Sequence, residues 1–192
     1  MFDRPDFLNN AVNISRMIIS HKISEGDIVV DATVGHGNDT LFLARIVGRS
    51  GKVYGFDVHK EAIRNTERLL EHNNCSGNVE LINDGHQHLD RYVRKKIKLA
   101  LFNLGYLPNF GRESATRYDT TMEALRKSID VLDSYGLVLL VIYHGHLDGV
   151  REKKEISDFA ASLPQRKYNV FYLDLINQIN NPPVLIGIEK RE

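Results

Sequence analysis

The segment from Val29 to Thr40 constrains this chain more than any other, because it reads as an apolar strand, a glycine turn and the start of a helix. Gly35 and Gly37 can adopt backbone angles that other residues disfavour, and they leave room for a ligand against the backbone. The N–H groups at a helix start lack partners within the helix, so they favour polar or anionic ligand groups. This pattern predicts a nucleotide site on an α/β fold.

A carboxylate follows the next apolar strand, where Asp57 can accept hydrogen bonds from both hydroxyls of a ribose. A dinucleotide site would need a third glycine where Thr40 stands. A pyrophosphate would also be disfavoured by the carboxylate of Asp31, which suits the positive amino group of a methionine moiety. The pattern therefore favours S-adenosylmethionine (SAM) over NAD, and a vestigial site without chemistry is the remaining alternative. The residues expected to hold this cofactor are Asp31, Thr33, Gly35, Gly37, Asn38, Asp39, Thr40, Asp57, Asp84 and His86.

Length and composition fit a single domain over residues 1–192, since the chain has 192 residues of which 42% are hydrophobic. Cys75 is the single cysteine, which excludes an internal disulfide. The sequence contains no leader or membrane-length apolar stretch, so we expect a soluble, cytoplasmic protein. The 25 basic and 25 acidic residues balance, so any RNA contact must use a local patch. The densest basic cluster, at Arg91–Lys98, more often indicates solvated surface than an RNA site.

Apolar residues at spacings of three and four predict an N-terminal helix at about 6–20. Beyond it, strands and helices alternate. A capping box at Thr120 and Glu123 and a stop at Gly136 mark the ends of one helix. The last two strands are joined too closely for a parallel crossover and must form a hairpin. The predicted strands are 28–33, 52–57, 79–82, 98–103, 137–143, 168–174 and 184–189, and the later helices are 38–47, 60–73, 120–133 and 149–162.

This order of elements predicts an α/β fold of the Rossmann-like class I SAM methyltransferase type. Its seven-stranded sheet would be mostly parallel with an antiparallel last strand, and helices would cover both faces. Ligands should gather at the carboxyl ends of the parallel strands. After the third strand, Asp84 could accept a hydrogen bond from an adenine amino group, with His86 beside it. The alternative for this segment is an ordinary Asp-Gly turn.

Asn103 and Tyr106 follow the fourth strand, where amino-methylating enzymes of this fold carry Asn or Asp, two prolines and an aromatic residue. The match is partial, because Leu104 and Gly105 replace the prolines. Asn103 can offer its side-chain carbonyl to an N–H of the target, and Tyr106 can stack on a base or exclude water. A simple strand-end turn is the alternative. A more literal Asn-Pro-Pro run begins at Asn181, but it precedes the last strand, where the prolines can end the hairpin.

Other polar residues are candidates for the substrate side of the site. His146 is a candidate proton acceptor after the fifth strand, although a structural histidine is as plausible. We expect no metal, because a third ligand at a recognisable spacing is missing. A purely structural turn is the alternative for the hairpin loop. The candidate substrate-binding residues are Arg112, Arg117, His144, Asn177, Gln178, Asn180 and Asn181.

Taken together, these features resemble a family of small bacterial proteins long described as rRNA methylases, the tRNA 5-aminomethyluridine methyltransferases of the MnmM type. The resemblance covers nearly the whole chain. The first segment that carries the resemblance is typical of the whole methyltransferase superfamily, and the other three indicate this family within it. The segments that carry it are Asp31–Thr40, Asn103–Pro108, Tyr143–Gly149, and Asn177, Gln178 and Asn180–Pro183 followed by Ile188, Glu189 and Lys190.

The resemblance implies SAM-dependent methylation of the aminomethyl group on the wobble uridine of tRNA, usually also 2-thiolated, giving the 5-methylaminomethyl form. Asn103 and Tyr106 would orient the amine and the base, and His146 would receive or relay the proton. The implied partner is the anticodon loop of tRNA, with no membrane partner and with a homodimer as a possible assembly. The alternatives are a SAM-dependent methyltransferase acting on rRNA or a small molecule, and a non-catalytic RNA-binding module.

Overall fold

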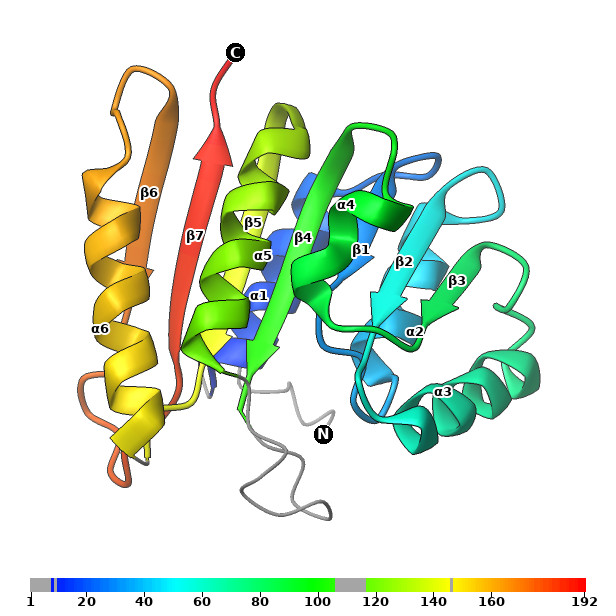
Figure 1. Cartoon of the computed structure of the whole chain (residues 1–192), viewed down its shortest axis with the longest axis horizontal. Helices are drawn as coiled ribbons and strands as arrows, with labels where there is room; N and C mark the ends of the chain where they lie inside the picture. The colour runs from blue at the N-terminus through cyan, green and yellow to red at the C-terminus, as the bar shows by residue number, and fades with distance from the viewer. Residues whose placement is uncertain (1–7, 9, 106–116, 146) are drawn as a thin grey trace, which may run out of the picture.

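The computed structural model describes residue 8 and residues 10–105, 117–145 and 147–192. These residues form one twisted sheet between two layers of helices (Figure 1). The strands are β1 (Ile28–Asp31), β2 (Lys52–Phe56), β3 (Val79–Ile82), β4 (Ile97–Leu104), β5 (Leu132–Ile142), β6 (Tyr168–Leu173) and β7 (Val184–Lys190). The helices are α1 (Ala11–Lys22), α2 (Asn38–Val47), α3 (Lys60–His72), the 3-10 turn η1 (His86–His88), α4 (Leu89–Tyr92), α5 (Tyr118–Val131) and α6 (Leu147–Ser162).

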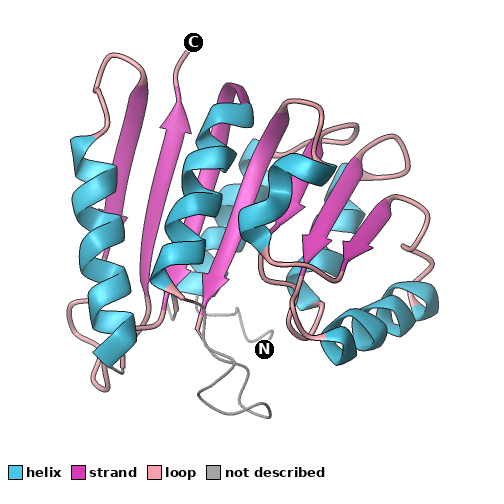
Figure 2. Ribbon diagram, in the orientation of Figure 1, coloured by secondary structure: helices cyan, strands magenta, loops and turns pink. Residues whose placement is uncertain are grey.

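In the part of the chain that the structure describes, the strands form a seven-stranded sheet in the order β3-β2-β1-β4-β5-β7-β6. The pairs β1·β2, β1·β4, β2·β3 and β4·β5 are parallel, whereas β7 is antiparallel to both of its neighbours. The alternation of strands and helices seen in Figure 2 explains the parallel pairs, because each crossover packs a helix on the sheet. The predicted fold class is confirmed, including the antiparallel last strand.

Two apolar cores lie on opposite faces of the sheet. Helices α1, α2 and α3 bury residues such as Ile19, Leu43 and Leu70 on one face. Helices α4, α5 and α6 bury residues such as Leu125 and Ile156 on the other face. The central strands are therefore covered on both sides, which explains why β4 and β5 are near-continuous apolar runs.

Some predicted element ends are wrong. Helix α5 begins at Tyr118, two residues before the predicted start, so Thr120 lies inside the helix and its hydroxyl donates to the carbonyl of Arg117 at 2.9 Å. The capping box is therefore not formed. The helix ends at Val131, well before Gly136, because Leu132 is already buried in the sheet as the partner of Ile97. Neither η1 nor α4 was predicted from the sequence.

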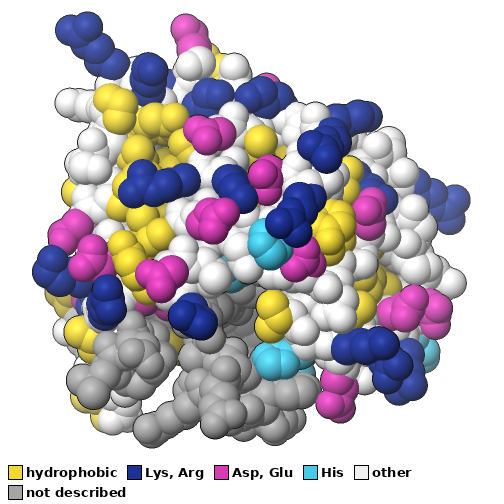
Figure 3. Space-filling model, in the orientation of Figure 1, with side chains coloured by type: hydrophobic (Ala, Val, Ile, Leu, Met, Phe, Trp, Pro, Cys, Tyr) yellow, Lys and Arg dark blue, Asp and Glu magenta, His cyan; other side chains and the backbone are white. Residues whose placement is uncertain are grey.

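The carboxyl ends of the parallel strands meet at the lower edge of Figure 1. Val184 pairs with Ile142, so the loop between β6 and β7 lies at this same edge, beside the end of β5. A separate groove of about 530 Å³ runs between α6 and β6, with Ala160, Phe171 and Ile186 in its lining. Figure 3 shows hydrophobic side chains gathered over these elements. This groove is at the far end of the strand order from β1, so it is remote from the glycine turn.

No helix among the described residues is long and apolar enough to cross a membrane.

Candidate active site

The glycine turn after β1 is held tightly in place by α3. Gly35 and Gly37 have φ angles of 52° and 78°, in the left-handed region that favours glycine. A Cβ on Gly37 would come within 2.5 Å of the Thr66 hydroxyl oxygen, which is buried in α3. Glycine at this position therefore serves both the backbone angle and the close packing of the turn on α3. Asn38 follows as the first residue of α2 and is exposed, so the start of α2 faces outward from the core.

Asp57, directly after β2, is tied to this turn. Its Oδ2 accepts the N–H of Gly35 at 2.8 Å, and its Oδ1 accepts the N–H of His59 at 2.8 Å. Each carboxylate oxygen has a second lone pair that these bonds do not use. The arrangement supplies a fixed acceptor beside the glycine turn, which is the chemistry that a pair of ribose hydroxyls requires.

Asp31 ends β1 as a buried carboxyl group with 1% exposure. Its Oδ2 accepts the hydroxyl of Thr40 at 2.6 Å, and its Oδ1 accepts the N–H of Thr33 at 3.1 Å. Burial, and next the nearby charge of Asp39, raise the pKa of Asp31 to about 7. The predicted contact of Asp31 with a positive amino group stays a prediction, and a cation there would favour the ionised form.

Asp39 and Asn103 are brought together although they lie on α2 and β4. Asp39 Oδ1 pairs with Arg16 of α1, with the guanidinium Nη2 at 2.6 Å and Nε at 2.9 Å. Asp39 Oδ2 accepts the side-chain amide of Asn103 at 3.3 Å. The backbone N–H of Asn103 donates to the hydroxyl of Thr33 at 2.8 Å. The candidate catalytic amide is thus joined directly to the glycine-turn segment.

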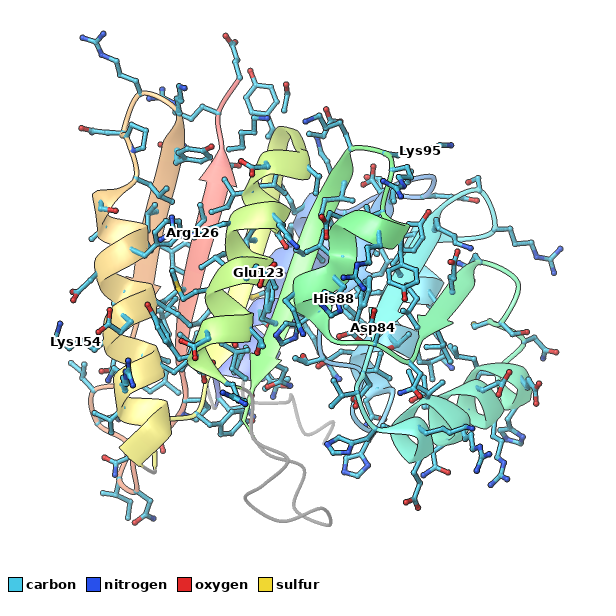
Figure 4. The ribbon with its side chains drawn as sticks, viewed as in Figure 1. Asp84, His88, Lys95, Glu123, Arg126 and Lys154 are labelled. Carbon is cyan, nitrogen blue, oxygen red and sulfur yellow. The ribbon has the colours of Figure 1, made fainter. Side chains whose placement is uncertain are left out.

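Asp84 lies in a compact polar network in the loop after β3. Its carboxylate accepts from His88 Nδ1 at 2.8 Å, the backbone N–H of Gly85 at 2.8 Å and the Tyr92 hydroxyl at 3.0 Å. The hydrogen bond from His88 lowers the pKa of the Asp84 carboxyl below its usual value. Figure 4 shows Asp84 and His88 side by side. This network orders the loop, and the predicted contact of Asp84 with adenine stays a prediction.

His86 is a buried polar residue of the same loop. Its Nδ1 is 2.9 Å from the carbonyl of Ala32, so Nδ1 carries the proton and Nε2 is a bare acceptor. Burial lowers the pKa of this histidine, which keeps it neutral. Its Nε2 is buried without a hydrogen-bond partner among the described residues.

The ends of β5 and β6 lie at the same edge of the sheet as the glycine turn. Tyr143 is 40% exposed, and its ring lies 3.3 Å from where a Cβ of Gly105 would be. His144 follows it, with a buried Nε2 that lacks a partner among the described residues. The β6–β7 loop carries exposed amides, and two of them, Asn180 and Asn181, have φ angles of 67° and 51°. Asn177, Gln178, Asn180 and Asn181 are all exposed at this edge.

Some predicted site residues lie outside the described residues, namely Tyr106, Arg112 and His146. Arg117 is described and is exposed as the residue before α5. Within the described ranges, no group of three or more His, Cys, Asp or Glu side chains could hold a metal ion.

The basic cluster lies at the opposite end of the strands from the glycine turn. Lys95 is at the end of the molecule where β4 begins (Figure 4). Lys96 and Lys98 donate to the carbonyls of Asp130 and Ser134 at 2.9 and 2.7 Å. These two lysines therefore bind backbone carbonyls at and beyond the end of α5.

Arg16 belongs to the candidate site and was not predicted from the sequence. It lies 23 positions before Asp39, and no motif surrounds it. The available signal was its place in the helix, one residue after the buried Ser15 and three before the buried Ile19. A charged residue at the border of an apolar stripe needs a partner on the neighbouring element.

Comparison with known proteins identifies the family. The family model described as "Putative rRNA methylase" matches residues 53–189, which is more than half of the chain. The chain belongs to this rRNA methylase family. A relative, the chloroplastic tRNA (mnm(5)s(2)U34)-methyltransferase of Arabidopsis thaliana, is 34% identical over 192 residues, covering 95% of this chain and 70% of that protein. The resemblance stated from the sequence motifs is confirmed.

Two solved structures are similar to this member of the rRNA methylase family over nearly their full length. The structure described as a "putative rRNA-methylase" from Clostridium thermocellum is 44% identical, with a TM-score of 0.92, and covers 95% of this chain and 98% of its own. A "putative methyltransferase" from Streptococcus mutans in complex with SAH is 38% identical, with a TM-score of 0.85, and covers 99% of each chain.

Proposed function

We propose that this protein transfers a methyl group from SAM to the exocyclic amine of 5-aminomethyluridine, or its 2-thio form, at the wobble position of tRNA. The protein is a SAM-dependent methyltransferase, as its family membership and the SAH complex of a 38% identical relative support. The wobble substrate is supported by the name of the plant relative, a tRNA (mnm(5)s(2)U34)-methyltransferase.

The described residues fit SAM as the methyl donor. The glycine turn and the start of α2 offer backbone N–H groups for its polar end, and Asp57 offers acceptors for its ribose. When bound, SAM supplies an electrophilic methyl group on a positively charged sulfur. Neutral His86 and the Asp84 network border the place where the adenine would lie.

One observation carries the proposal, the hydrogen bond of 2.8 Å from the Asn103 backbone N–H to the Thr33 hydroxyl. It fixes the backbone that carries the Asn103 side-chain amide, at the end of β4, beside the segment that leads into the glycine turn. A carbonyl at that place can accept an N–H of the target amine, which leaves the nitrogen lone pair directed toward the methyl donor.

For the chemical step, the protein mainly has to position the amine against the methyl donor and to exclude water from the site. The amine must be neutral, so that its lone pair can form the new N–C bond while the C–S bond breaks and its electron pair stays on sulfur. The nitrogen then releases one proton, for which His146 is our candidate acceptor. Asn103 and Tyr106 would hold the amine and the base, and exclusion of water would favour the neutral amine over the ammonium form.

RNA recognition is expected along the same sheet edge. The strands β1, β4, β5 and β7 are consecutive neighbours, so β1 and β7, which adjoin the glycine turn and the β6–β7 loop, are about 14 Å apart at strand spacing. Bases in single-stranded RNA loops are commonly splayed out and read by side chains of the protein. The exposed amides of Asn177, Gln178, Asn180 and Asn181, together with Arg112, Arg117 and His144, are our candidates for these contacts.

Calorimetry with SAM and with NAD, followed by methyl transfer to purified RNAs, tests the proposal. We expect binding of SAM but not NAD, and methyl transfer to tRNA that carries the wobble aminomethyl group. Asn103→Ala should lower kcat about tenfold with little change in SAM affinity, the loss expected for one hydrogen bond. Asn169→Ala, in β6, is the matched control and should match wild type. Methyl transfer to rRNA or to a small molecule, or SAM binding without any turnover, would replace the proposal by the corresponding alternative.

A further inference from the structure

A chain of polar contacts runs from helix α1 to the candidate catalytic amide. It begins at Arg16, passes through Asp39 at the start of α2 and ends on the side chain of Asn103 in β4. We infer that Arg16 and Asp39 are positioning residues that fix the Asn103 amide with its oxygen directed toward the substrate amine. This inference rests on the proposed function, because it names the residues that orient the acceptor of that same site.

The orientation of Asn103 follows from what Asp39 can do. A carboxylate can only accept hydrogen bonds, so the group facing it must be the Asn103 amide nitrogen, which lies 3.3 Å from Asp39 Oδ2. The side-chain oxygen of Asn103 is then turned away from Asp39. The base of the side chain is also fixed, because the Asn103 N–H donates to the Thr33 hydroxyl at 2.8 Å. Two anchors therefore define which end of the amide is the acceptor.

Arg16 keeps Asp39 available for this contact. Two of its guanidinium nitrogens lie 2.6 and 2.9 Å from Asp39 Oδ1, which leaves Oδ2 for Asn103. The guanidinium also lies over the ring of Phe42, 5.5 Å from its centre, so the arginine is held from two sides. Asp39 retains 13% side-chain exposure and Arg16 35%. Because the Asp39 side of the pair is largely shielded from water, the pair keeps more of its mutual attraction than a fully exposed pair.

Arg16 also offsets a repulsion that would otherwise act on Asp39. Asp31 is buried close enough for the charge of Asp39 to raise its pKa. Without the guanidinium, Asp39 would face a second carboxyl group and lose its ion-pair partner, which favours a turn of its side chain toward solvent. A displaced Asp39 no longer requires the nitrogen of Asn103 to face it. The Asn103 amide could then adopt its flipped orientation, which presents N–H groups to an amine that needs an acceptor.

A double-mutant cycle tests this inference with SAM and aminomethylated tRNA. Arg16→Ala should lower kcat about tenfold, as expected for residues in one hydrogen-bond network, while SAM affinity stays within about twofold. In an Asn103→Ala background, the same change should alter kcat by less than about twofold, because the amide it orients is gone. Equal losses of kcat in both backgrounds would overturn the inference, since a structural role of Arg16 does not depend on Asn103.

Asp39→Asn is a second variant that preserves size and tests the acceptor argument itself. An asparagine can donate or accept toward Asn103, so both amide orientations become available, and kcat should fall about as far as in Arg16→Ala. Arg16→Lys keeps a cation and should retain more kcat than Arg16→Ala. Arg126→Ala, which removes a guanidinium 4.4 Å from the Phe159 ring centre on the other face of the sheet, is the matched control and should keep wild-type kcat. Wild-type kcat in Asp39→Asn would contradict the inference.

A measurement without substrate separates this inference from the proposed function. The side-chain amide signals of Asn103 in a nitrogen-15 spectrum are the pair that disappears in Asn103→Ala. Their exchange with water should become faster in Arg16→Ala and stay unchanged in Arg126→Ala. Unchanged exchange in Arg16→Ala would overturn the positioning role. If wild type transfers no methyl group to aminomethylated tRNA, the proposed function fails, whereas the exchange measurement still decides whether Arg16 fixes the amide.

Discussion

Replacement of Asp31 by asparagine should change how the stability of the protein depends on pH. The folded-state pKa of this buried carboxyl group is about 7, above its ordinary value of 3.8. Below about pH 4, both the folded and the unfolded states carry the proton, so the shift has no effect on stability. Between those pKa values the folded state binds more protons than the unfolded state, so the free energy of unfolding decreases as the pH rises.

The magnitude follows from the two pKa values. A shift of one pKa unit corresponds to about 1.36 kcal/mol, so ionisation of Asp31 costs the folded state about 4 kcal/mol once the pH exceeds both pKa values. Between about pH 5 and about pH 8 the same relation gives a change of about 2.5 kcal/mol. Asparagine cannot ionise, and its carbonyl and amide can serve Thr33 and Thr40 in place of the carboxyl group.

Urea denaturation at several pH values measures this effect. The free energy of unfolding of wild type should fall relative to Asp31→Asn by about 2.5 kcal/mol from about pH 5 to about pH 8. Asp133→Asn, which changes an exposed aspartate, should follow the wild-type profile. Parallel profiles for wild type and Asp31→Asn would refute the reasoning that burial raises the pKa of this group.

Two further predictions concern ligand contacts. Asp57→Ala should weaken SAM binding in calorimetry about 100-fold or more, because two hydrogen bonds to a carboxylate are lost. The control variant Asp158→Ala, on α6, should leave SAM binding unchanged. Equal SAM affinity in both variants would show that Asp57 does not belong to the cofactor site. The combined change of Asn180 and Asn181 to glycine preserves the positive φ angles and removes only the amides. It should raise KM for tRNA while SAM affinity stays the same, and an unchanged KM would make the β6–β7 loop a purely structural turn.

The fold was predictable because its signals are local and repeated. The predicted bounds of α2 and β3 match the structure, since glycine turns and short polar stretches surround them. The hairpin of β6 and β7 could be predicted from the short connection between the two strands, because a parallel crossover requires more residues. The end of α5 was not predictable from Gly136, because burial of Leu132 in the sheet ends the helix earlier. The end of α5 therefore depends on tertiary packing and not on the local residue types.

The candidate site was predictable only where the sequence itself places residues next to a glycine turn or a strand end. Asp57 and Asn103 could be found because Asp57 directly follows β2 and Asn103 lies in the last two residues of β4, and the carboxyl ends of parallel strands meet at one edge. Arg16 could not be found from a motif, because its partner Asp39 is brought close only when α1 packs beside α2. The hydrogen bond between Asp84 and Tyr92 was not predicted either, because Tyr92 lies in α4 and that helix was not predicted.

The most direct test of the central claim is mass spectrometry of nucleosides from tRNA incubated with the protein and SAM. Two preparations of the same tRNA should be compared, one with and one without the aminomethyl group on the wobble uridine. We expect one added methyl group, on the aminomethyl nitrogen, in the first preparation and no added methyl in the second. Plain uridine offers no comparable nucleophile at C5 without covalent activation, for which a cysteine usually serves. The chain's single cysteine, Cys75, lies between α3 and β3. A methyl group at another position, or equal methylation of both preparations, would contradict the assignment.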